Sequence, residues 1–343
     1  MRVGLIGTGA ISQKHALAYR NIGYQITVCT NRSLEAGRKF AATWGAEFVP
    51  TLEDVCAHPK VDFVDLCTFP DCRLEVVRMC AASGKDVLVQ KPMATDVATA
   101  REMIAIARRA GIQLGVMSQR RFDDAILFLR RAIASGRLGR IIQADGYVKW
   151  WRSPEYYSRP IKGRWETEGG GALINQAIHQ ADLLLHLVGE VRQVFGYWQL
   201  GSVHQIESED NLCAVIRYAN GASGVIQAST SLWPGYPERI ELHGTNGSAI
   251  VSGDKLTTWD IKDDPMASSD PPSLAKELTS GASDPMAISV VPFERQLKDF
   301  GEACANGRQP AISGEDGLRA LGLVSAIYRS CRLATSIDLD QQG

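Results

Sequence analysis

The feature that most constrains this chain is a glycine turn within its first dozen residues. The apolar run Val3-Gly4-Leu5-Ile6 leads into Gly7-Thr8-Gly9-Ala10-Ile11-Ser12, and a helical pattern follows directly. A dinucleotide-binding fingerprint requires this context, because Gly7 permits a tight turn and Gly9 lets the backbone approach a pyrophosphate at the helix N-terminus. Glycine turns also join strands to helices without any ligand. The context nevertheless favours a nucleotide site, with candidate cofactor-binding residues Gly7, Gly9, Ala10 and Ile11.

Length and hydrophobic periodicity predict two domains, since 343 residues exceed what one core usually supports. Apolar strand candidates at 25–29, 63–68, 86–89 and 113–116 alternate with helical patterns at 33–44, 73–83, 96–110 and 123–135. This alternation predicts a doubly wound α/β domain with a parallel sheet over residues 1–120. The second domain, 121–343, is expected to hold consecutive antiparallel strands at 192–200, 211–218, 222–230 and 239–243. Helices are expected there at 172–187, 293–305 and 315–334, and a long loop at 260–283.

Composition excludes several classes of partner. The 37 basic and 38 acidic residues give a net charge of -1 without a long run of one sign, which argues against nucleic acid or a membrane surface as a partner. No apolar stretch approaches membrane-spanning length. The eight cysteines form no CxxC pair and no zinc-like cluster with histidine, so we expect no metal site. Reduced thiols in a cytoplasmic protein are the simplest interpretation.

The end of the second expected strand bears on cofactor choice. An NAD-specific site usually has a carboxylate here for the ribose 2′-OH, whereas an arginine suits a 2′-phosphate. This chain has no carboxylate at that point but has Asn31, Arg32 and Ser33, which we predict to bind the cofactor. NADP(H) is therefore favoured, with NAD(H) as the alternative. Ser33 could equally cap the next helix beside a solvated arginine.

Two further motifs carry the candidate chemistry. Lys91 lies in Val89-Gln90-Lys91-Pro92, at the carboxyl end of a parallel strand, where ligands of such sheets bind. Asn175 and His179 follow a run of three glycines and are four residues apart, which predicts that they project from one helical face. Histidine titrates near neutrality and suits acid–base catalysis. The competing interpretations are a surface lysine and a hydrogen-bonded core histidine, and we assign His186 to the latter.

An aromatic and basic segment at 150–165 predicts recognition of a polyhydroxylated ring. Aromatic rings stack on the apolar faces of a sugar, while cations bond its hydroxyls or a carboxylate. Some of these aromatics could instead pack the domain junction. The predicted substrate-binding residues are Lys91, Arg121, Trp151, Tyr156, Arg164, Trp165, Asn175, Gln176 and His179.

Taken together, these motifs resemble the glucose–fructose oxidoreductase/inositol dehydrogenase (Gfo/Idh/MocA) family. The matching segments are the first turn from Gly7 to His15, Thr68-Phe69-Pro70, Gln90-Lys91-Pro92, and the glycine-rich stretch from Gly169 to His179. The resemblance implies a Rossmann domain, then an α/β domain with a large open, mostly antiparallel sheet that forms a homodimer or homotetramer. It also implies NAD(P)-dependent oxidation or reduction of a sugar, anhydrosugar or cyclitol, and places Thr68 and Lys91 among the cofactor-binding residues.

The chain departs from the family pattern at three positions. Gln90 replaces the usual glutamate, Arg73 stands where many members have histidine, and Asn175 replaces the usual aspartate. Asn175-Gln176 resembles the subset that acts on a secondary hydroxyl of a sugar ring, often at carbon 3. The implied catalytic residues are His179 as acid/base, Lys91 as its electrostatic partner and Asn175 as an orienting donor. An NAD-dependent glycosidase and a non-catalytic NAD(P)-binding sensor are the alternatives. Retention of both Lys91 and His179 argues against the sensor.

Overall fold

The computed structural model of this chain describes residues 1–263, 280–282 and 288–339. It divides into two compact units, Met1–Gln119 with Ser289–Leu318, and Arg120–Ile288 with Arg319–Gly343. Most of the loop expected at 260–283 lies outside the described residues, and its first two residues belong instead to a strand that ends at Ile261.

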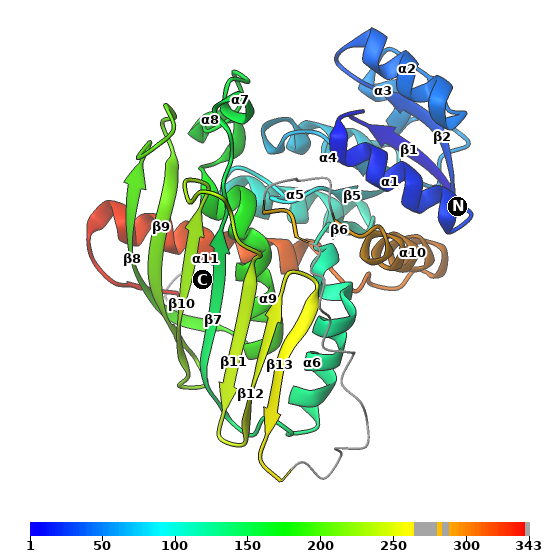
Figure 1. Cartoon of the computed structure of the whole chain (residues 1–343). Helices are drawn as coiled ribbons and strands as arrows, with labels where there is room; N and C mark the ends of the chain where they lie inside the picture. Colours follow the sequence, from blue (N-terminus) through cyan, green and yellow to red (C-terminus); the bar gives the residue numbers. More distant parts are fainter. Residues whose placement is uncertain (264–279, 283–287, 340–343) are drawn as a thin grey trace. The chain divides into compact units, whose positions relative to one another are not determined.

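The first unit is built on a parallel sheet in the order β3-β2-β1-β4-β5-β6 (Figure 1). Val3, Leu5, Val28, Phe63 and Val87 are fully buried, because both faces of such a sheet are covered by helices. The observed strands agree with those expected to within two residues at either end, and two short elements, β3 and α3, carried too few residues to be recognised. The strands are β1 (Arg2–Ile6), β2 (Gln25–Thr30), β3 (Glu47–Phe48), β4 (Phe63–Leu66), β5 (Asp86–Val89) and β6 (Leu114–Val116).

Local sequence sets the helix boundaries in this unit. Ser33, Thr51 and Asp96 each cap a helix by accepting a backbone N–H, and Gly45 and Gly111 end two helices in the left-handed conformation. The helices are α1 (Ala10–Asn21), α2 (Leu34–Trp44), α3 (Leu52–Cys56), η1 (Pro70–Cys72), α4 (Arg73–Ala82) and α5 (Val97–Ala110).

The expected domain boundary at residue 120 assigns all later residues to the second domain, but residues 289–318 belong to the first unit. Helix α10 (Val291–Asn306) packs in the first unit, where Phe300 lies edge-on to Phe63 with ring centres 5.2 Å apart. A Cβ on Gly301 would lie 2.5 Å from the ring of Tyr24, so the glycine allows the close approach of α10 to this unit. Long-range packing of this kind leaves no signal in local periodicity. Helix α11 (Gly314–Leu333) begins in the first unit and continues in the second.

The second unit contains a sheet of eight strands in the order β13-β12-β11-β7-β10-β9-β8-β14. It is mostly antiparallel, as expected, but β7 and β10 pair in parallel, and β11 pairs with β7 rather than with β10. The expectation of consecutive antiparallel strands is therefore wrong at the centre, because the unrecognised strand β7 inserts between them. The strands are β7 (Ile141–Lys149), β8 (Val191–Leu200), β9 (Glu209–Tyr218), β10 (Ser223–Ser229), β11 (Arg239–Gly244), β12 (Gly247–Ser252), β13 (Lys255–Ile261) and β14 (Ile337–Asp338).

Helices cover one face of this sheet (Figure 1). Gly146 of β7 lies against Gln180 and Leu184 of α9 (Ile178–Val188). The ring of Phe128 on α6 (Asp124–Ala134) packs on the ring of Trp259 on β13, with ring centres 4.8 Å apart. The helix expected at 172–187 begins as a π-helical turn, and such turns are frequent at functional sites. The helical elements are η2 (Gln119–Phe122), α6 (Asp124–Ala134), α7 (Pro154–Tyr157), α8 (Trp165–Glu168), η3 (Leu173–Ala177) and α9 (Ile178–Val188). Within the described residues, no helix combines the length and the apolar character that crossing a membrane requires.

Candidate active site

The glycine turn has the geometry that a dinucleotide needs. Gly7 has a φ of 92°, and a Cβ there would lie 2.9 Å from the carbonyl oxygen of Cys67, so both the conformation and the space demand glycine. Around Gly9, in contrast, an added Cβ would meet nothing within 4 Å. Gly9 is the N-cap of α1 and gives the helix no side-chain cap, so the first N–H groups of α1 are available to an anion.

Two buried hydroxyl oxygens lie at this turn, one within it and one beside it. The Oγ1 atoms of Thr8 and Thr68 are buried and have no hydrogen-bond partner among the described residues. Because buried hydroxyls are almost always bonded, these two atoms can form hydrogen bonds with a ligand bound at the turn. The residues present therefore fit a dinucleotide, and the side chain of Thr68 lies beside Gly7.

The residues after β2 are arranged around the same turn. Asn31 Oδ1 accepts a hydrogen bond from the Thr8 backbone N–H at 3.3 Å, and its amide donates to the Ser33 carbonyl at 3.1 Å. Ser33 Oγ accepts from the Ala36 N–H at 3.3 Å, which confirms that Ser33 caps α2. Arg32 is exposed at the end of β2. Asn31 thus ties the turn to β2, a role that the sequence did not indicate.

Lys91 follows β5 and is held in place by a buried arginine. Arg73 is 2% exposed, and its guanidinium donates hydrogen bonds to the carbonyls of Thr68, Gln90 and Pro92. These bonds fix the backbone on both sides of Lys91. Burial lowers the pKa of Arg73 to about 10. The sequence marked Arg73 only as a departure from the family pattern, and its function as a clamp became visible in the fold.

Gln90, the residue before Lys91, joins a second buried network. His15 Nδ1 donates to Asp65 Oδ2 at 2.6 Å, and the Gln90 side-chain amide donates to His15 Nε2 at 2.6 Å. The two bonds together assign the imidazole proton to Nδ1. Tyr19 donates to the same carboxylate at 2.9 Å. His15, Asp65 and Cys67 also group three potential metal ligands within 4.8 Å of one another, but these hydrogen bonds account for the polar atoms of His15 and Asp65.

Asn175 and His179 lie in the second unit, on the segment formed by η3 and α9. Asn175 belongs to the π-helical turn, so the expectation of one shared face, which rests on α-helical spacing, applies only in part. The Asn175 amide donates to the carbonyls of Gly170 and Gly171 at 3.1 and 3.2 Å. These bonds hold the side-chain amide of Asn175 against the glycine run.

A buried carboxylate anchors the start of this segment. Glu209 accepts hydrogen bonds from the N–H groups of Gly171 and Leu173 at 2.8 and 2.7 Å, and from the Tyr328 hydroxyl at 2.7 Å. A Cβ on Gly171 would lie 1.8 Å from the Glu209 carbonyl oxygen, so only glycine fits there. Desolvation raises the pKa of Glu209 to about 7 despite these donors. Sequence reasoning missed Glu209 because it lies some forty positions further along the chain.

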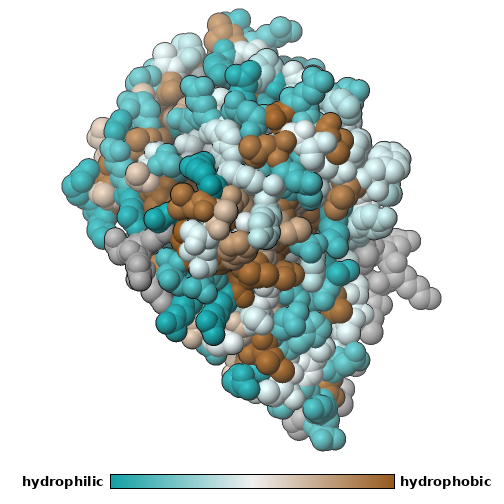
Figure 2. Space-filling view, turned by 90° about the vertical axis from the view of Figure 1, so that its left-hand side faces the viewer, coloured by the Kyte–Doolittle hydropathy of each residue, from teal (hydrophilic) through white to brown (hydrophobic). Residues whose placement is uncertain are grey.

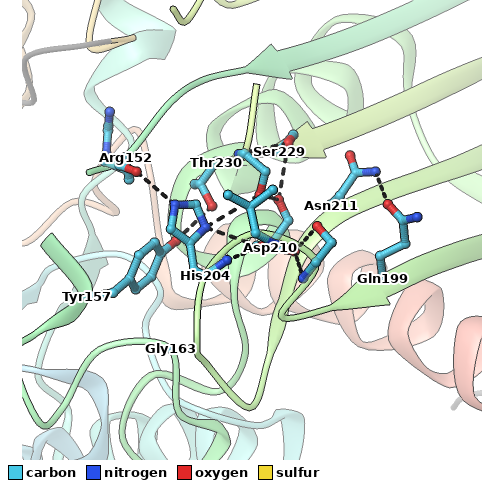
Figure 3. A network of polar contacts seen from close by, with 12 residues as sticks. Arg152, Tyr157, Gly163, Gln199, His204, Asp210, Asn211, Ser229 and Thr230 are labelled. Atoms are coloured by element: carbon cyan, nitrogen blue, oxygen red, sulfur yellow. Dashed lines mark hydrogen bonds and ion pairs between the residues drawn. The ribbon is translucent and has the colours of Figure 1, made fainter. Parts of the chain in front are cut away.

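The aromatic segment is anchored by a histidine, as Figure 3 shows. His204 Nε2 donates to the Arg152 carbonyl at 2.8 Å, while Nδ1 lies 3.2 Å from Asp210 Oδ2. Hydrogen bonds from Ser202, Val203 and His204 hold the pKa of Asp210 well below its usual value. The ring of Tyr157 lies 4.6 Å from the His204 ring, and its hydroxyl pairs with Thr230 at 2.8 Å. The segment is thus held in place by buried polar contacts.

The predicted substrate-binding residues fall into two groups. Tyr156 and Gln176 meet directly, because the Gln176 amide donates to the Tyr156 hydroxyl at 3.3 Å. Trp151 packs on His204 and Trp233, at 5.5 and 5.7 Å between ring centres. The others are placed differently. Arg121 forms a buried bidentate ion pair with Asp182, Arg164 is exposed, and Trp165 packs between Trp198 and Tyr328. His186, expected to be a core histidine, is half-buried.

A parallel sheet in this strand order, with a glycine turn after β1, defines the first unit as a dinucleotide-binding domain. Residues 1–118 match the oxidoreductase family with an NAD-binding Rossmann fold, and residues 126–250 match the GFO/IDH/MocA C-terminal domain. The chain therefore belongs to the Gfo/Idh/MocA family of oxidoreductases, which confirms both the expected family and the α/β fold.

Relatives of known name support this assignment. The inositol 2-dehydrogenase of Rhizobium meliloti (strain 1021) is 25% identical over 96% of each chain. The 1,5-anhydro-D-fructose reductase of Ensifer adhaerens is 26% identical over 99% of this chain and 98% of that protein. Among solved structures, the WlbA dehydrogenase from Bordetella pertussis in complex with NADH and UDP-GlcNAcA has a TM-score of 0.85 and 29% identity, with 98% of each chain covered.

Proposed function

We propose that this protein transfers hydride between a nicotinamide cofactor and a secondary hydroxyl or ketone of a sugar, anhydrosugar or cyclitol, with carbon 3 of a pyranose as the candidate position. The observation that carries the proposal is the uncapped N-terminus of α1 behind Gly7 and Gly9, in a chain of the Gfo/Idh/MocA family. Relatives named for inositol and for 1,5-anhydro-D-fructose support the substrate class.

The cofactor is assigned to the first unit. The glycine turn with Ala10 and Ile11 would hold the phosphates, and Thr68 and Lys91 would line the site beyond them. When bound, the nicotinamide accepts or gives the hydride. We infer a preference for NADP(H), because Arg32 is exposed after β2 and no carboxylate stands at 31–33 to receive a ribose 2′-OH.

The remaining chemistry belongs to side chains of this chain. In the direction of oxidation, His179 takes the proton of the substrate hydroxyl as its carbon becomes a carbonyl, and in reduction it returns that proton. Lys91 stabilises the negative charge that develops on the oxygen, and Asn175 orients the substrate by hydrogen bonding. Tyr156, Gln176 and Trp151 bind the ring of the substrate, with Arg164, Trp165 and Arg121 as further predicted contacts.

The open face of the second sheet supports a homodimer or homotetramer. Tyr197 on β8 and Val215 on β9 are 68% and 55% exposed, and Phe195 and Cys213 pair with them across the two strands. Viewed from the side on which β8 lies, Figure 2 shows hydrophobic side chains gathered among hydrophilic ones. Light scattering should therefore report the mass of an oligomer. Val215→Lys places a charge on this face and should weaken the association of the subunits.

Absorbance of the reduced nicotinamide tests the reaction. Monosaccharides, anhydrosugars and cyclitols should be screened with NADP and NAD in both directions, and we expect turnover of at least one ring and none of simple 2-hydroxy acids. Activity confined to small acids or aliphatic alcohols would refute the proposal. Hydrolysis of a glycoside without net change in absorbance would instead identify a glycosidase.

A further inference from the structure

Three cationic side chains surround the ring of Tyr156, and fewer carboxylates are paired with these cations. Lys162, Arg159 and Arg152 stand over this ring, 5.0, 5.5 and 5.6 Å from its centre. Lys162 is paired with the buried carboxylate of Glu168. No carboxylate among the described residues pairs with Arg159 or Arg152, so this group carries excess positive charge.

Arg152 is buried and forms no ion pair with a carboxylate among the described residues, and the negative charge of Glu238, which acts on it, is already paired with Arg120. Arg152 is 4% exposed, and its guanidinium donates to the carbonyls of Trp151, Gly281 and Ala282 at 2.8 to 3.0 Å. Its Nε is buried and has no partner within the described residues. Carbonyl groups satisfy the N–H donors, but they do not neutralise the charge, and an unneutralised buried charge is costly. A bound anion near Tyr156 would offset that cost.

The cations are directly linked to the segment that bears the proposed reacting groups. Gln176, which follows Asn175, donates to the Tyr156 hydroxyl. Gln176 is 6% exposed, and its Oε1 is buried with no partner among the described residues. A buried amide oxygen without a donor marks a position where a ligand hydroxyl can bind. A position that can bind a ligand hydroxyl therefore lies next to the excess positive charge around Tyr156.

We propose that the substrate is an anionic sugar, with its carboxylate or phosphate bound by Arg159 beside Tyr156 and a ring hydroxyl bound by Gln176. Arg159 is the residue that contacts the anion, because it is exposed. Arg152 is buried and attracts the anion electrostatically without touching it. Lys162 is already neutralised by Glu168 and contributes less. This inference rests on the proposed sugar oxidoreductase function and specifies its substrate class.

Matched substrates test it. Glucuronate, glucose 6-phosphate and glucose differ only in the group at carbon 6, and galacturonate, galactose 6-phosphate and galactose form a second set. We expect kcat/KM to be at least about tenfold higher for one of the two anions than for the neutral sugar, and which anion is preferred distinguishes carboxylate from phosphate. Arg159→Ala should raise KM for that anion by about ten- to a hundredfold, the range expected for losing a charge-assisted hydrogen bond. KM for the neutral sugar should change by less than about twofold.

Arg332→Ala is the matched control, because Arg332 is an exposed arginine near the end of α11 and its loss changes net charge equally. The inference is overturned if neutral sugars react as well as the anions, or if the two variants affect the anion alike. Those results leave the proposed reaction standing. If no ring in either set or in the wider screen changes nicotinamide absorbance, the proposed function itself fails, and the inference with it.

Discussion

The two units hold their proposed reactive groups by buried ionisable side chains of opposite hydrogen-bonding character. In the first unit, the guanidinium of Arg73 donates to the backbone carbonyls of Thr68, Gln90 and Pro92 and so fixes the backbone around Lys91. In the second, the carboxylate of Glu209 accepts from the N–H groups of Gly171 and Leu173, where the segment with Asn175 and His179 begins.

The sign of each charge follows from the backbone that it meets. Chain segments at the carboxyl ends of β4 and β5 present carbonyls, which need a donor, and guanidinium is a donor only. The start of a helix presents N–H groups, which need an acceptor, and a carboxylate is an acceptor only. In both places a buried ionisable side chain is partnered by main-chain groups rather than by a counter-ion, with the Tyr328 hydroxyl as a further donor to Glu209. Each therefore positions a neighbouring reactive residue, and the two should respond differently to substitution and to pH.

Removing the reactive groups themselves should have the largest effect. His179→Ala should lower the rate of hydride transfer by ~10²–10⁴-fold, the usual contribution of general acid–base catalysis. Lys91→Met should also lower this rate, because the charge that stabilises the developing oxyanion is lost. Asn175→Ala should be milder, and Asn175→Asp should be tolerated. Single-turnover transfer at saturating cofactor measures the step, with a nucleotide titration to show that binding persists. His186→Ala, on the same helix, is the control, and near-normal transfer by both main variants would remove the catalytic assignment.

Replacing Arg73, the cationic clamp, should have the second-largest effect. Arg73→Met leaves buried carbonyls without donors and should lower the free energy of unfolding by roughly 3–5 kcal/mol, since each hydrogen bond to a charged group contributes ~1.5–3 kcal/mol. Arg73→Lys should restore only part of this, because lysine lacks the planar fork. Urea unfolding gives the stability, and kcat of the folded fraction reports on Lys91. Arg78→Met in the same helix removes an exposed arginine, and an equal loss in both variants would contradict the clamp.

Removing the anionic clamp should change the pH dependence of stability. The pKa of Glu209 is raised from 4.5 to about 7, so the native state holds a proton that the unfolded chain has released between these values. Its contribution is full below about pH 4.5 and is lost as pH rises through about 7. The stability advantage of the unmodified protein over Glu209→Gln should therefore shrink by on the order of 3 kcal/mol between pH 5 and 8.

Denaturant unfolding at several pH values measures this difference. Glu166→Gln, which alters an exposed carboxylate in α8, should give a difference that does not vary with pH. A Glu209→Gln difference that is flat with pH, or one that grows as pH rises, would contradict the raised pKa.

Replacing Arg32 should have the smallest effect, a change in cofactor preference that arises in the first unit alone. Arg32→Ala should weaken NADP(H) by about 1.5–3 kcal/mol through loss of a charged hydrogen bond, while NAD(H) and the KM of the sugar change little. Steady-state kinetics with both cofactors measure it, with Arg38→Ala on α2 as the control. Equal or better use of NAD by the unmodified protein would reject the NADP(H) assignment.

The order of strands and helices could be predicted from the sequence wherever a local rule governs it. The glycine turn, the alternation up to residue 120 and the cap at Ser33 each depend on residues a few positions apart, so spacing alone predicts them. The family motifs likewise marked Lys91, Asn175 and His179 as candidates. The same approach failed for β7, for the parallel pairing of β7 with β10 and for the return of α10, because those depend on which distant segments pack together.

Only the tertiary structure identified the residues that hold these candidates in place. Glu209 meets Gly171 across 38 positions, and Arg73 meets Gln90 across 17, so neither contact has a local signature. A buried ionisable side chain acquires its role from the backbone groups that folding brings to it, and backbone groups carry almost no information about residue type. Residue identity could therefore propose candidates for the reacting side chains, whereas the contacts that position those candidates required the fold.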